Sequence, residues 1–194
     1  MSSLREQRRY EIIEAAMKVF GEHGFYQGKV GEIAKEAGIG KGTVYEYFGS
    51  KKEIFQQMLM YMFETYVEGG KKAVIGEKAI RDKLIVLLDY HYAFVNQYAD
   101  VIERTFFHFE NIVKDIKPEI AQNKRKIFDF VLEIITEGIE TGELRSNLDK
   151  ETASIIILGI VNSSHLKRIF IKADSINKID SRAVIDMVLL GMGR

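Results

Sequence analysis

Proline occurs only once in this chain of 194 residues, at position 118. Because proline removes a backbone donor and interrupts helices, a chain with so little of it accommodates long helices. Glycine supplies the interruptions instead: eight glycines lie between Gly21 and Gly49, and a pair follows at Gly69 and Gly70. We therefore expect short segments in the N-terminal quarter and long helices in the remainder.

Apolar residues recur with the spacing of one helix face along the chain, and no strand-like alternation bounded by turns is found. Ser50 and Glu53 form the capping-box pattern of a helix start, and Gly69 with Gly70 is expected to end that helix. The periodicity predicts an all-α fold of about nine helices, over residues 5–23, 30–37, 41–48, 51–68, 84–98, 101–114, 118–140, 149–172 and 181–191.

The composition is that of a globular protein, with 46% hydrophobic and 29% charged residues. Lys and Arg number 28 and Asp and Glu number 28, so no overall basic excess points to nucleic acid. The absence of cysteine excludes disulfides, Cys-based zinc sites and a Cys nucleophile. No secretory signal is recognised, and the longest apolar run, residues 155–161, is far shorter than the roughly 20 residues of a membrane helix. We expect a cytoplasmic protein with no membrane contact.

Residues 30–48 have the pattern of a helix-turn-helix unit. Two short helices flank a turn that contains Gly38, and Ile33, Val44 and Phe48 supply an apolar seam between them. In such units the second helix enters the DNA major groove. Helical corners of this kind also occur in proteins that do not bind DNA, so the pattern by itself indicates the unit and not its partner.

The stretch VGEIAKEAGIGKGTVYEYFGSKKEIF, residues 30–55, resembles the DNA-binding signature of the TetR (tetracycline-repressor) family of bacterial regulators. The match runs through Ile33-Ala34, Gly38-Ile39 and residues 41–48, and the first helix is similar too. Gly40 replaces the usual serine before the recognition helix, but glycine is an acceptable N-cap. The resemblance implies a helix-turn-helix DNA-binding domain over residues 1–48 and an effector-binding and dimerisation domain over residues 49–194.

The resemblance further implies a transcriptional regulator, usually a repressor, that binds a palindromic double-stranded DNA operator as a homodimer. Residues 1–52 hold nine basic and seven acidic side chains, so placement of charge matters more than its total. Arg5, Arg8 and Arg9 are expected to form an N-terminal arm. The predicted DNA-binding residues, some implied by the resemblance and some added for their charge or position, are Lys29, Lys41, Gly42, Thr43, Tyr45, Tyr47 and Lys51.

Tyr45 and Tyr47 are two residues apart and so diverge by about 200° around a helix. At least one of them is expected to be exposed and to reach a phosphate or a thymine methyl group. Phe48 is assigned to the core.

Residues 155–161 are apolar around the whole helix, and such a helix must be buried on all sides. A second subunit is a natural cover, and two helices from each subunit would form a four-helix bundle across a twofold axis. A helix in the core of a single chain is the alternative. The predicted dimer interface consists of Ile157, Ile160, Val161, Val184, Met187 and Val188.

The middle helices are rich in aromatic residues, and the resemblance implies that they enclose a pocket for a small effector. Apolar pockets with few polar groups are usual for small molecules, so we expect an apolar or amphipathic effector. Aromatic stripes are also typical of a plain core, and His91 has the alternative of a hydrogen-bonded core histidine. The predicted ligand-binding residues are His91, Phe94, Tyr98, Phe107, His108 and Phe128.

Two other classes of function are compatible with an all-α chain. An all-α enzyme is disfavoured because the four histidines are far apart in sequence, with no metal-binding pair and no nucleophile elbow. Lys41-Gly42-Thr43 resembles the end of a P-loop, but the required upstream glycine and strand are missing. We therefore expect no enzyme, no cofactor and no metal. A helical adaptor that binds a protein through its helix-turn-helix is the other alternative, and salt dependence separates it from a DNA-binding protein.

Overall fold

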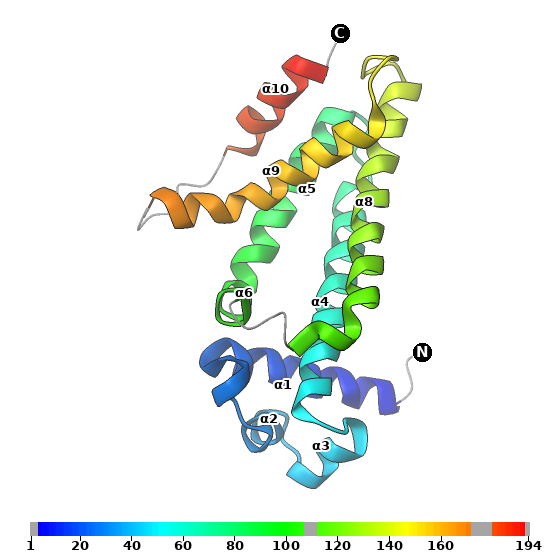
Figure 1. Cartoon of the computed structure of the whole chain (residues 1–194). Helices are drawn as coiled ribbons and strands as arrows, with labels where there is room; N and C mark the ends of the chain where they lie inside the picture. Colours follow the sequence, from blue (N-terminus) through cyan, green and yellow to red (C-terminus); the bar gives the residue numbers. More distant parts are fainter. Residues whose placement is uncertain (1–3, 107–111, 172–179, 193–194) are drawn as a thin grey trace. The chain divides into compact units, whose positions relative to one another are not determined.

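The computed structural model describes residues 4–106, 112–171 and 180–192. All regular elements in these ranges are helical, which confirms the predicted all-α class (Figure 1). They are nine α-helices and one 3-10 turn: α1 (Leu4–Gln27), α2 (Val30–Glu36), α3 (Lys41–Tyr47), α4 (Lys51–Val74), α5 (Ile80–Gln97), α6 (Ala99–Phe106), η1 (Lys114–Ile116), α8 (Lys117–Glu140), α9 (Lys150–Ile171) and α10 (Ser181–Met192).

The chain divides into two compact units, and the first consists of residues 1–65 and 95–123. Its centre is aromatic: the ring of Phe55 on α4 lies 5.5 Å from that of Phe20 and 5.1 Å from that of Phe25, both on α1. Helix α6 packs on α1 where Gly21 leaves room, because a Cβ there would lie 3.2 Å from Val101 Cγ2. This packing holds the helices that follow α1 on a rigid base.

The second unit consists of residues 66–94 and 124–194. Lys83 of α5 and Glu137 of α8 form an ion pair of 2.6 Å, and Arg81 of α5 binds Asp186 of α10 through two hydrogen bonds of 2.6 and 2.9 Å. Its buried core draws on α5, α8, α9, α10 and the loop after α8: Ile80, Leu84, Ile85, Leu87, Leu88, Phe130, Val131, Ile134, Ile135, Leu144, Ala153, Ile157, Val161 and Ile185.

Helix ends follow the signals in the sequence. The Glu53 backbone N–H donates to Ser50 Oγ at 3.1 Å, which confirms Ser50 as the cap of α4. The Glu53 carboxylate accepts the N–H of Gly49 at 2.8 Å, one residue earlier than a capping box requires. At the start of α9 the Asp149 carboxylate accepts two backbone N–H groups, and these bonds lower the pKa of Asp149.

One of two predicted helix ends marked by glycine was wrong and the other was confirmed. Helix α4 does not stop at residue 68 but continues through Gly69 and Gly70 to Val74, because there the glycines make room for packing rather than for a turn. The predicted end of the first helix at residue 23 is confirmed, because Gly24 has a left-handed φ of 70° and interrupts α1 with a kink, after which residues 25–27 form a short helical continuation. The predicted helix over residues 101–114 corresponds to α6 and η1, with residues 107–111 outside the described ranges.

Candidate nucleic-acid interface

The helix-turn-helix unit is held together by a small buried seam. Ile33 and Ala34 of α2 pack with Val44 of α3 and with Phe48, and none of these side chains is more than 2% exposed. Between the helices Gly38 adopts a φ of 67°, and the N–H of Ile39 returns to the carbonyl of Ala34 at 2.9 Å. Glycine adopts this left-handed conformation without strain, so the turn fixes α3 relative to α2.

Helix α3 buries one side and presents the other to solvent. Gly40 caps it in an extended conformation, and Lys41, Gly42 and Tyr45 are exposed, with Tyr45 46% exposed. Thr43 and Tyr47 are half-buried. The structure thus confirms that one of the two tyrosines is exposed, and Tyr45 is that residue.

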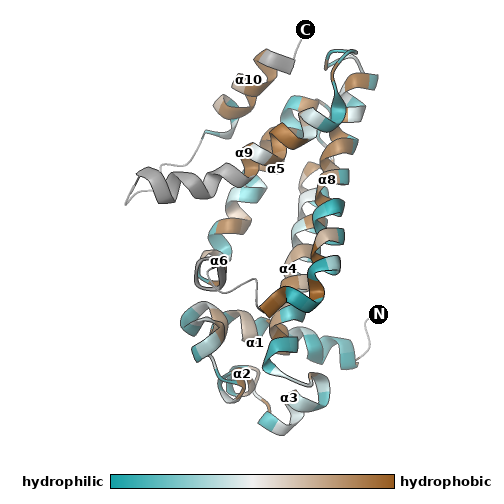
Figure 2. Cartoon of the chain, viewed as in Figure 1, coloured by the Kyte–Doolittle hydropathy of each residue, from teal (hydrophilic) through white to brown (hydrophobic). Residues whose placement is uncertain are grey.

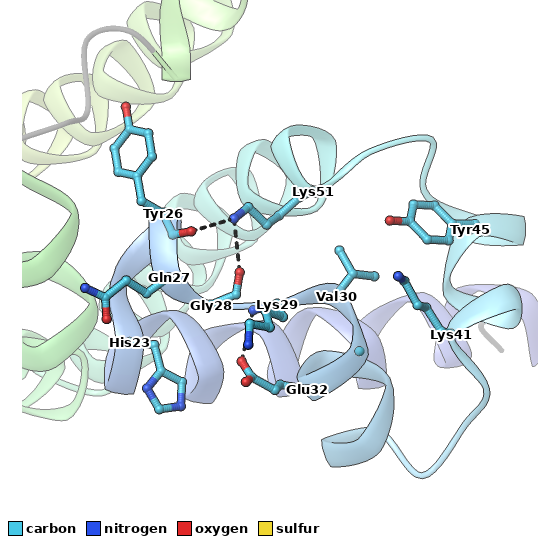
Figure 3. Close-up of a pocket in the computed structure, with 11 residues that line it drawn as sticks. His23, Tyr26, Gln27, Gly28, Lys29, Val30, Glu32, Lys41, Tyr45 and Lys51 are labelled. Atoms are coloured by element: carbon cyan, nitrogen blue, oxygen red, sulfur yellow. Dashed lines mark hydrogen bonds between the residues drawn. The ribbon is translucent and has the colours of Figure 1, made fainter.

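An open hollow of about 750 Å³ lies beside this face of α3 (Figure 3). Lys41 and Tyr45 of α3 line it on one side, and His23 and Gln27 of α1 lie on the other. Its full lining is His23, Tyr26, Gln27, Gly28, Lys29, Val30, Gly31, Glu32, Lys41, Tyr45 and Lys51.

Three lysines and a single carboxylate line the hollow, so its charge is mainly positive. The carboxylate, Glu32, accepts the backbone N–H of Lys29 at 3.0 Å and so caps the start of α2. Lys29 and Lys41 are exposed. A concave surface with exposed cations suits the phosphate backbone of a nucleic acid.

Lys51 is placed differently from the other predicted cations. Its Nζ donates to the carbonyls of Tyr26 at 3.1 Å and Gly28 at 3.0 Å (Figure 3). The same Nζ lies 4.8 Å from the centre of the Phe25 ring. Partial burial lowers the pKa of Lys51. Sequence reasoning missed this internal role, because the carbonyls come from a helix end more than twenty residues earlier.

The N-terminal arginines do not form an extended arm, since Arg5, Arg8 and Arg9 all lie within α1. Arg9 donates from Nη1 to the carbonyl of Tyr47 at 2.9 Å and lies 4.6 Å from the centre of the Phe48 ring. Arg5 lies 5.9 Å from the centre of the Tyr47 ring. These arginines support the end of α3, and α1 is helical from Leu4 onward.

Among the predicted ligand-binding residues, the structure brings His91 and Phe94 together. Both surround Tyr66 of α4: a hydrogen bond of 3.1 Å joins its hydroxyl to His91 Nδ1, and its ring centre lies 5.1 Å from that of Phe94. Tyr90, with its ring centre 5.7 Å from that of Tyr66, completes the cluster. Burial raises the pKa of Tyr66, which keeps the hydroxyl protonated. Tyr66 belongs to the apolar stripe of α4, and that stripe is the sequence signal that could have predicted its place in this cluster.

The remaining predicted ligand-binding residues have other surroundings or lie outside the described part of the chain. Phe128 is half-buried and stacks with the Arg125 guanidinium, whose Cζ lies 5.1 Å from the ring centre. Tyr98 belongs to the first unit and is half-buried. Phe107 and His108 lie outside the described residues.

The predicted dimer residues fall into two groups. Ile157 and Val161 are buried in the chain's own core, so α9 is covered on that face without a partner. Ile160, Val184 and Val188 are half-buried, and Met187 is 74% exposed. Residues 155–161 are not buried on all sides by their own chain, because one face of α9 packs inward and the other remains open, which goes against the alternative of a helix in the core of a single chain. Burial of the open face by a second subunit stays a prediction.

Apolar residues on α9 and α10 form the open face, and Figure 2 shows the hydrophobic character of both helices. Besides Met187, its exposed members are Ile155, Ile156 and Leu190. Sequence reasoning missed these three, since periodicity alone does not tell which side of an all-apolar helix faces inward.

Neither a metal site nor a membrane span is found in the described part of the chain. No group of three or more His, Asp or Glu side chains there is placed to hold a metal ion. None of its helices is long and apolar enough to cross a membrane.

Two family models match the chain over most of its length. The model for bacterial regulatory proteins of the tetR family matches residues 12–58, which contain α2 and α3. The model for the tetracyclin repressor-like C-terminal domain matches residues 77–166. The chain belongs to the TetR family. As a TetR-family protein it is a DNA-binding transcriptional regulator and not an enzyme.

Individual TetR-family relatives agree with this assignment. The fatty acid metabolism regulator protein of Bacillus subtilis (strain 168) is 25% identical over 154 residues, which are 79% of each chain. The fatty acid degradation regulator FadR from Bacillus halodurans has the same fold, with a TM-score of 0.74, 22% identity and coverage of 98% of this chain and 96% of that one. FadR from Bacillus subtilis in complex with stearoyl-CoA gives a TM-score of 0.69, 24% identity and coverage of 93% and 95%.

Proposed function

We propose that this protein is a homodimeric repressor that binds a palindromic operator and releases it when an amphipathic acyl compound binds. The observation that carries the DNA-binding part is the construction of α3. Val44 and Phe48 anchor the helix in a buried seam, while Lys41 and Tyr45 are exposed beside a positively charged hollow. An anchored short helix with an exposed face is what insertion into a major groove requires.

The exposed residues divide into two roles in this proposal. Lys29 and Lys41 neutralise backbone phosphates and so position the unit on the duplex. Tyr45 contacts a phosphate or a thymine methyl group, with Thr43 and Tyr47 next to it on α3. Gly42 lets the backbone of α3 approach the DNA closely.

A single helix-turn-helix reads one half-site, so operator recognition requires two copies of the chain. The exposed apolar face of α9 and α10 supports a homodimer with a helical interface. Residues 1–48 would then bind DNA, and residues 49–194 would bind the effector and the second subunit. Two half-sites are expected at centres about 34–36 Å apart, or at a multiple of that distance.

Two observations support an amphipathic acyl compound as the effector. The Tyr66–His91 pair, between Phe94 and Tyr90, combines an apolar surface with one polar pair, which suits an amphipathic ligand. The relatives named for fatty acid metabolism and the structure with stearoyl-CoA point to the same ligand chemistry. Such a ligand weakens DNA binding only to the extent that it prefers the conformation that does not bind DNA.

Stearoyl-CoA is the probe that tests the effector part. A duplex recovered from a random pool is bound to the protein, and stearoyl-CoA is added below its micelle-forming concentration, with coenzyme A as the matched control. We expect stearoyl-CoA to dissociate the complex and to raise the melting temperature of the free protein, and coenzyme A to do neither. Stabilisation by small polyanions alone would refute an amphipathic effector. Failure to recover any duplex would instead refute the DNA-binding part.

A further inference from the structure

Lys51 joins the start of α4 to the end of α1. It is the first residue of α4, and its ammonium group donates to the carbonyls of Tyr26 and Gly28 at 3.1 and 3.0 Å. The ring of Phe25 covers the same ammonium group, with its centre 4.8 Å from Nζ. Two parts of the chain, the link between α1 and α2 and the start of α4, therefore meet at one side chain (Figure 3).

The direction of the Lys51 side chain has a clear electrostatic reason. The last carbonyls of a helix have no partner within it and carry partial negative charge, so a cation placed there is favourable. At the start of its own helix the same cation is unfavourable. The ammonium group is thus placed on the carbonyl of Tyr26, in the short helical piece after the kink at Gly24, and on that of Gly28, which follows α1, and not against the N–H groups at the start of α4. Partial burial replaces part of the hydration of the ammonium group with these contacts and lowers the pKa of Lys51.

The segment that Lys51 holds is fixed on its other side by tight packing. A Cβ on Gly28 would lie 3.0 Å from both the Gly24 carbonyl oxygen and Phe20 Cδ1, so the backbone of Gly28 is pressed against α1. The Gly28 N–H donates to the Gly24 carbonyl at 3.1 Å. Lys29 follows at once and caps α2. A displacement of the Gly28 backbone would therefore also displace α2, and with it α3, which packs on α2.

We infer that Lys51 is a positioning residue for operator recognition and not a phosphate contact. Its ammonium group pins the junction of α1 and α2 to α4, and so sets where Lys29 and the recognition helix meet the DNA. This inference rests on the proposed function, because it assigns a role within operator binding. The sequence suggests the opposite for a lysine at the start of α4, namely a direct contact with DNA.

Salt dependence distinguishes the two roles. Each lysine that neutralises a phosphate adds about 0.9 to the slope of log affinity against log salt, on any DNA sequence. A positioning residue contributes nothing to that slope. Its loss misplaces the base-reading surface, so affinity falls for the operator and not for a random duplex.

Two variants test Lys51: Lys51→Met keeps an apolar side chain of similar length, and Lys51→Arg keeps the charge and the donors. Lys41→Met is the matched control, because Lys41 is exposed. Dissociation constants for the operator and a random duplex are measured by fluorescence anisotropy over a range of salt. We expect Lys51→Met to lose roughly tenfold or more in operator affinity, the effect of losing hydrogen bonds to a charged group. Its affinity for the random duplex and both salt slopes should stay unchanged. Lys51→Arg should recover operator affinity, and Lys41→Met should lower both slopes.

A measurement on the wild-type protein keeps the test valid if Lys51→Met does not fold. In ¹⁵N-lysine spectra of the ammonium groups, the Lys51 signal is assigned by its loss in Lys51→Arg. We expect this signal to keep its position when operator DNA is added, while the Lys41 signal moves. A Lys51 signal that moves on DNA binding, or a salt slope that drops by about one for both duplexes in Lys51→Met, would overturn the inference. If wild-type protein selects no operator, the proposed function fails and not the placement of Lys51.

Discussion

Gly42 leaves an open space on the exposed face of α3. A Cβ at this position would meet no protein atom within 4 Å, so nothing inside the chain requires glycine there. Glycine in a helix is also less favourable than alanine, by about 1 kcal/mol at interior positions. The fold does not require glycine at position 42, and glycine weakens α3. We therefore explain Gly42 by the close approach of a binding partner to this face of the helix.

Gly42→Ala should therefore separate stability from DNA binding. We expect the free energy of unfolding in urea to stay level or rise by up to about 1 kcal/mol, because alanine favours the helix. Operator affinity should fall, since the added methyl group lies between α3 and the DNA. Unchanged operator affinity in Gly42→Ala would remove Gly42 from the interface.

The sequence predicts some of these single residues and not others. The exposure of Tyr45 follows from helical spacing once Val44 and Phe48 are assigned to the core. The internal role of Lys51 does not follow, because its partners are backbone carbonyls, which carry no signal in a sequence. The same holds for Arg9, whose partner is the carbonyl of Tyr47.

At the scale of elements, α4 contains two glycines that do not end it. The ring of Tyr90 on α5 lies against Gly69, where a Cβ would be 2.7 Å from Tyr90 Cζ. A Cβ on Gly70 would lie 3.3 Å from Phe130 Cε1. These glycines let α5 and α8 pack closely on α4. The close packing also brings Tyr90 beside Tyr66 and its bond with His91.

Gly69→Ala should destabilise the protein although alanine favours helices. The added Cβ occupies the place of the Tyr90 ring, and overpacking of this kind costs about 1–3 kcal/mol. The measurement is the free energy of unfolding in urea for Gly69→Ala, Tyr90→Ala and the double variant. In the double variant the penalty of the added methyl group should disappear, which a double-mutant cycle records as coupling. Additive effects would show that Tyr90 is not the constraint.

Helix periodicity predicts the elements well and their ends less well. The spacing of apolar residues locates the helices because that spacing follows from burial of one face. The Gly69-Gly70 pair leads to a wrong prediction of the end of α4, because glycine is favoured both in turns and where helices pack closely. Only the neighbouring helices determine which of the two applies. Pro118, in contrast, stands in the first turn of α8, where its missing N–H costs nothing.

In the described part of the chain, several large apolar side chains on α9 and α10 stay exposed and form the open apolar face. Leu190 is 88% exposed and Met187 74%. The sequence indicates that this region is apolar enough for an interface. It does not indicate that Ile157 and Val161 face inward, because an all-apolar helix has no polar side to mark its orientation.

Leu190→Glu should weaken the dimer without unfolding the subunit, because it places a charge in the proposed interface and not in the core. Ile75→Glu is the matched control, since Ile75 is 76% exposed in the turn after α4. Sedimentation velocity over a range of protein concentrations should show dissociation of Leu190→Glu and an intact dimer for Ile75→Glu. Circular dichroism should give the same helix content for both. A stable Leu190→Glu dimer would place the interface elsewhere.

The most direct test of the central claim is selection of bound sequences from a random duplex library by the purified protein, at near-physiological salt. We expect an enriched palindrome whose half-sites are about one helical turn apart, or a multiple of it, and loss of that enrichment in Tyr45→Ala with unchanged melting. An enriched sequence without twofold symmetry would contradict the dimeric arrangement. Recovery of no preferred sequence would contradict operator recognition by α3.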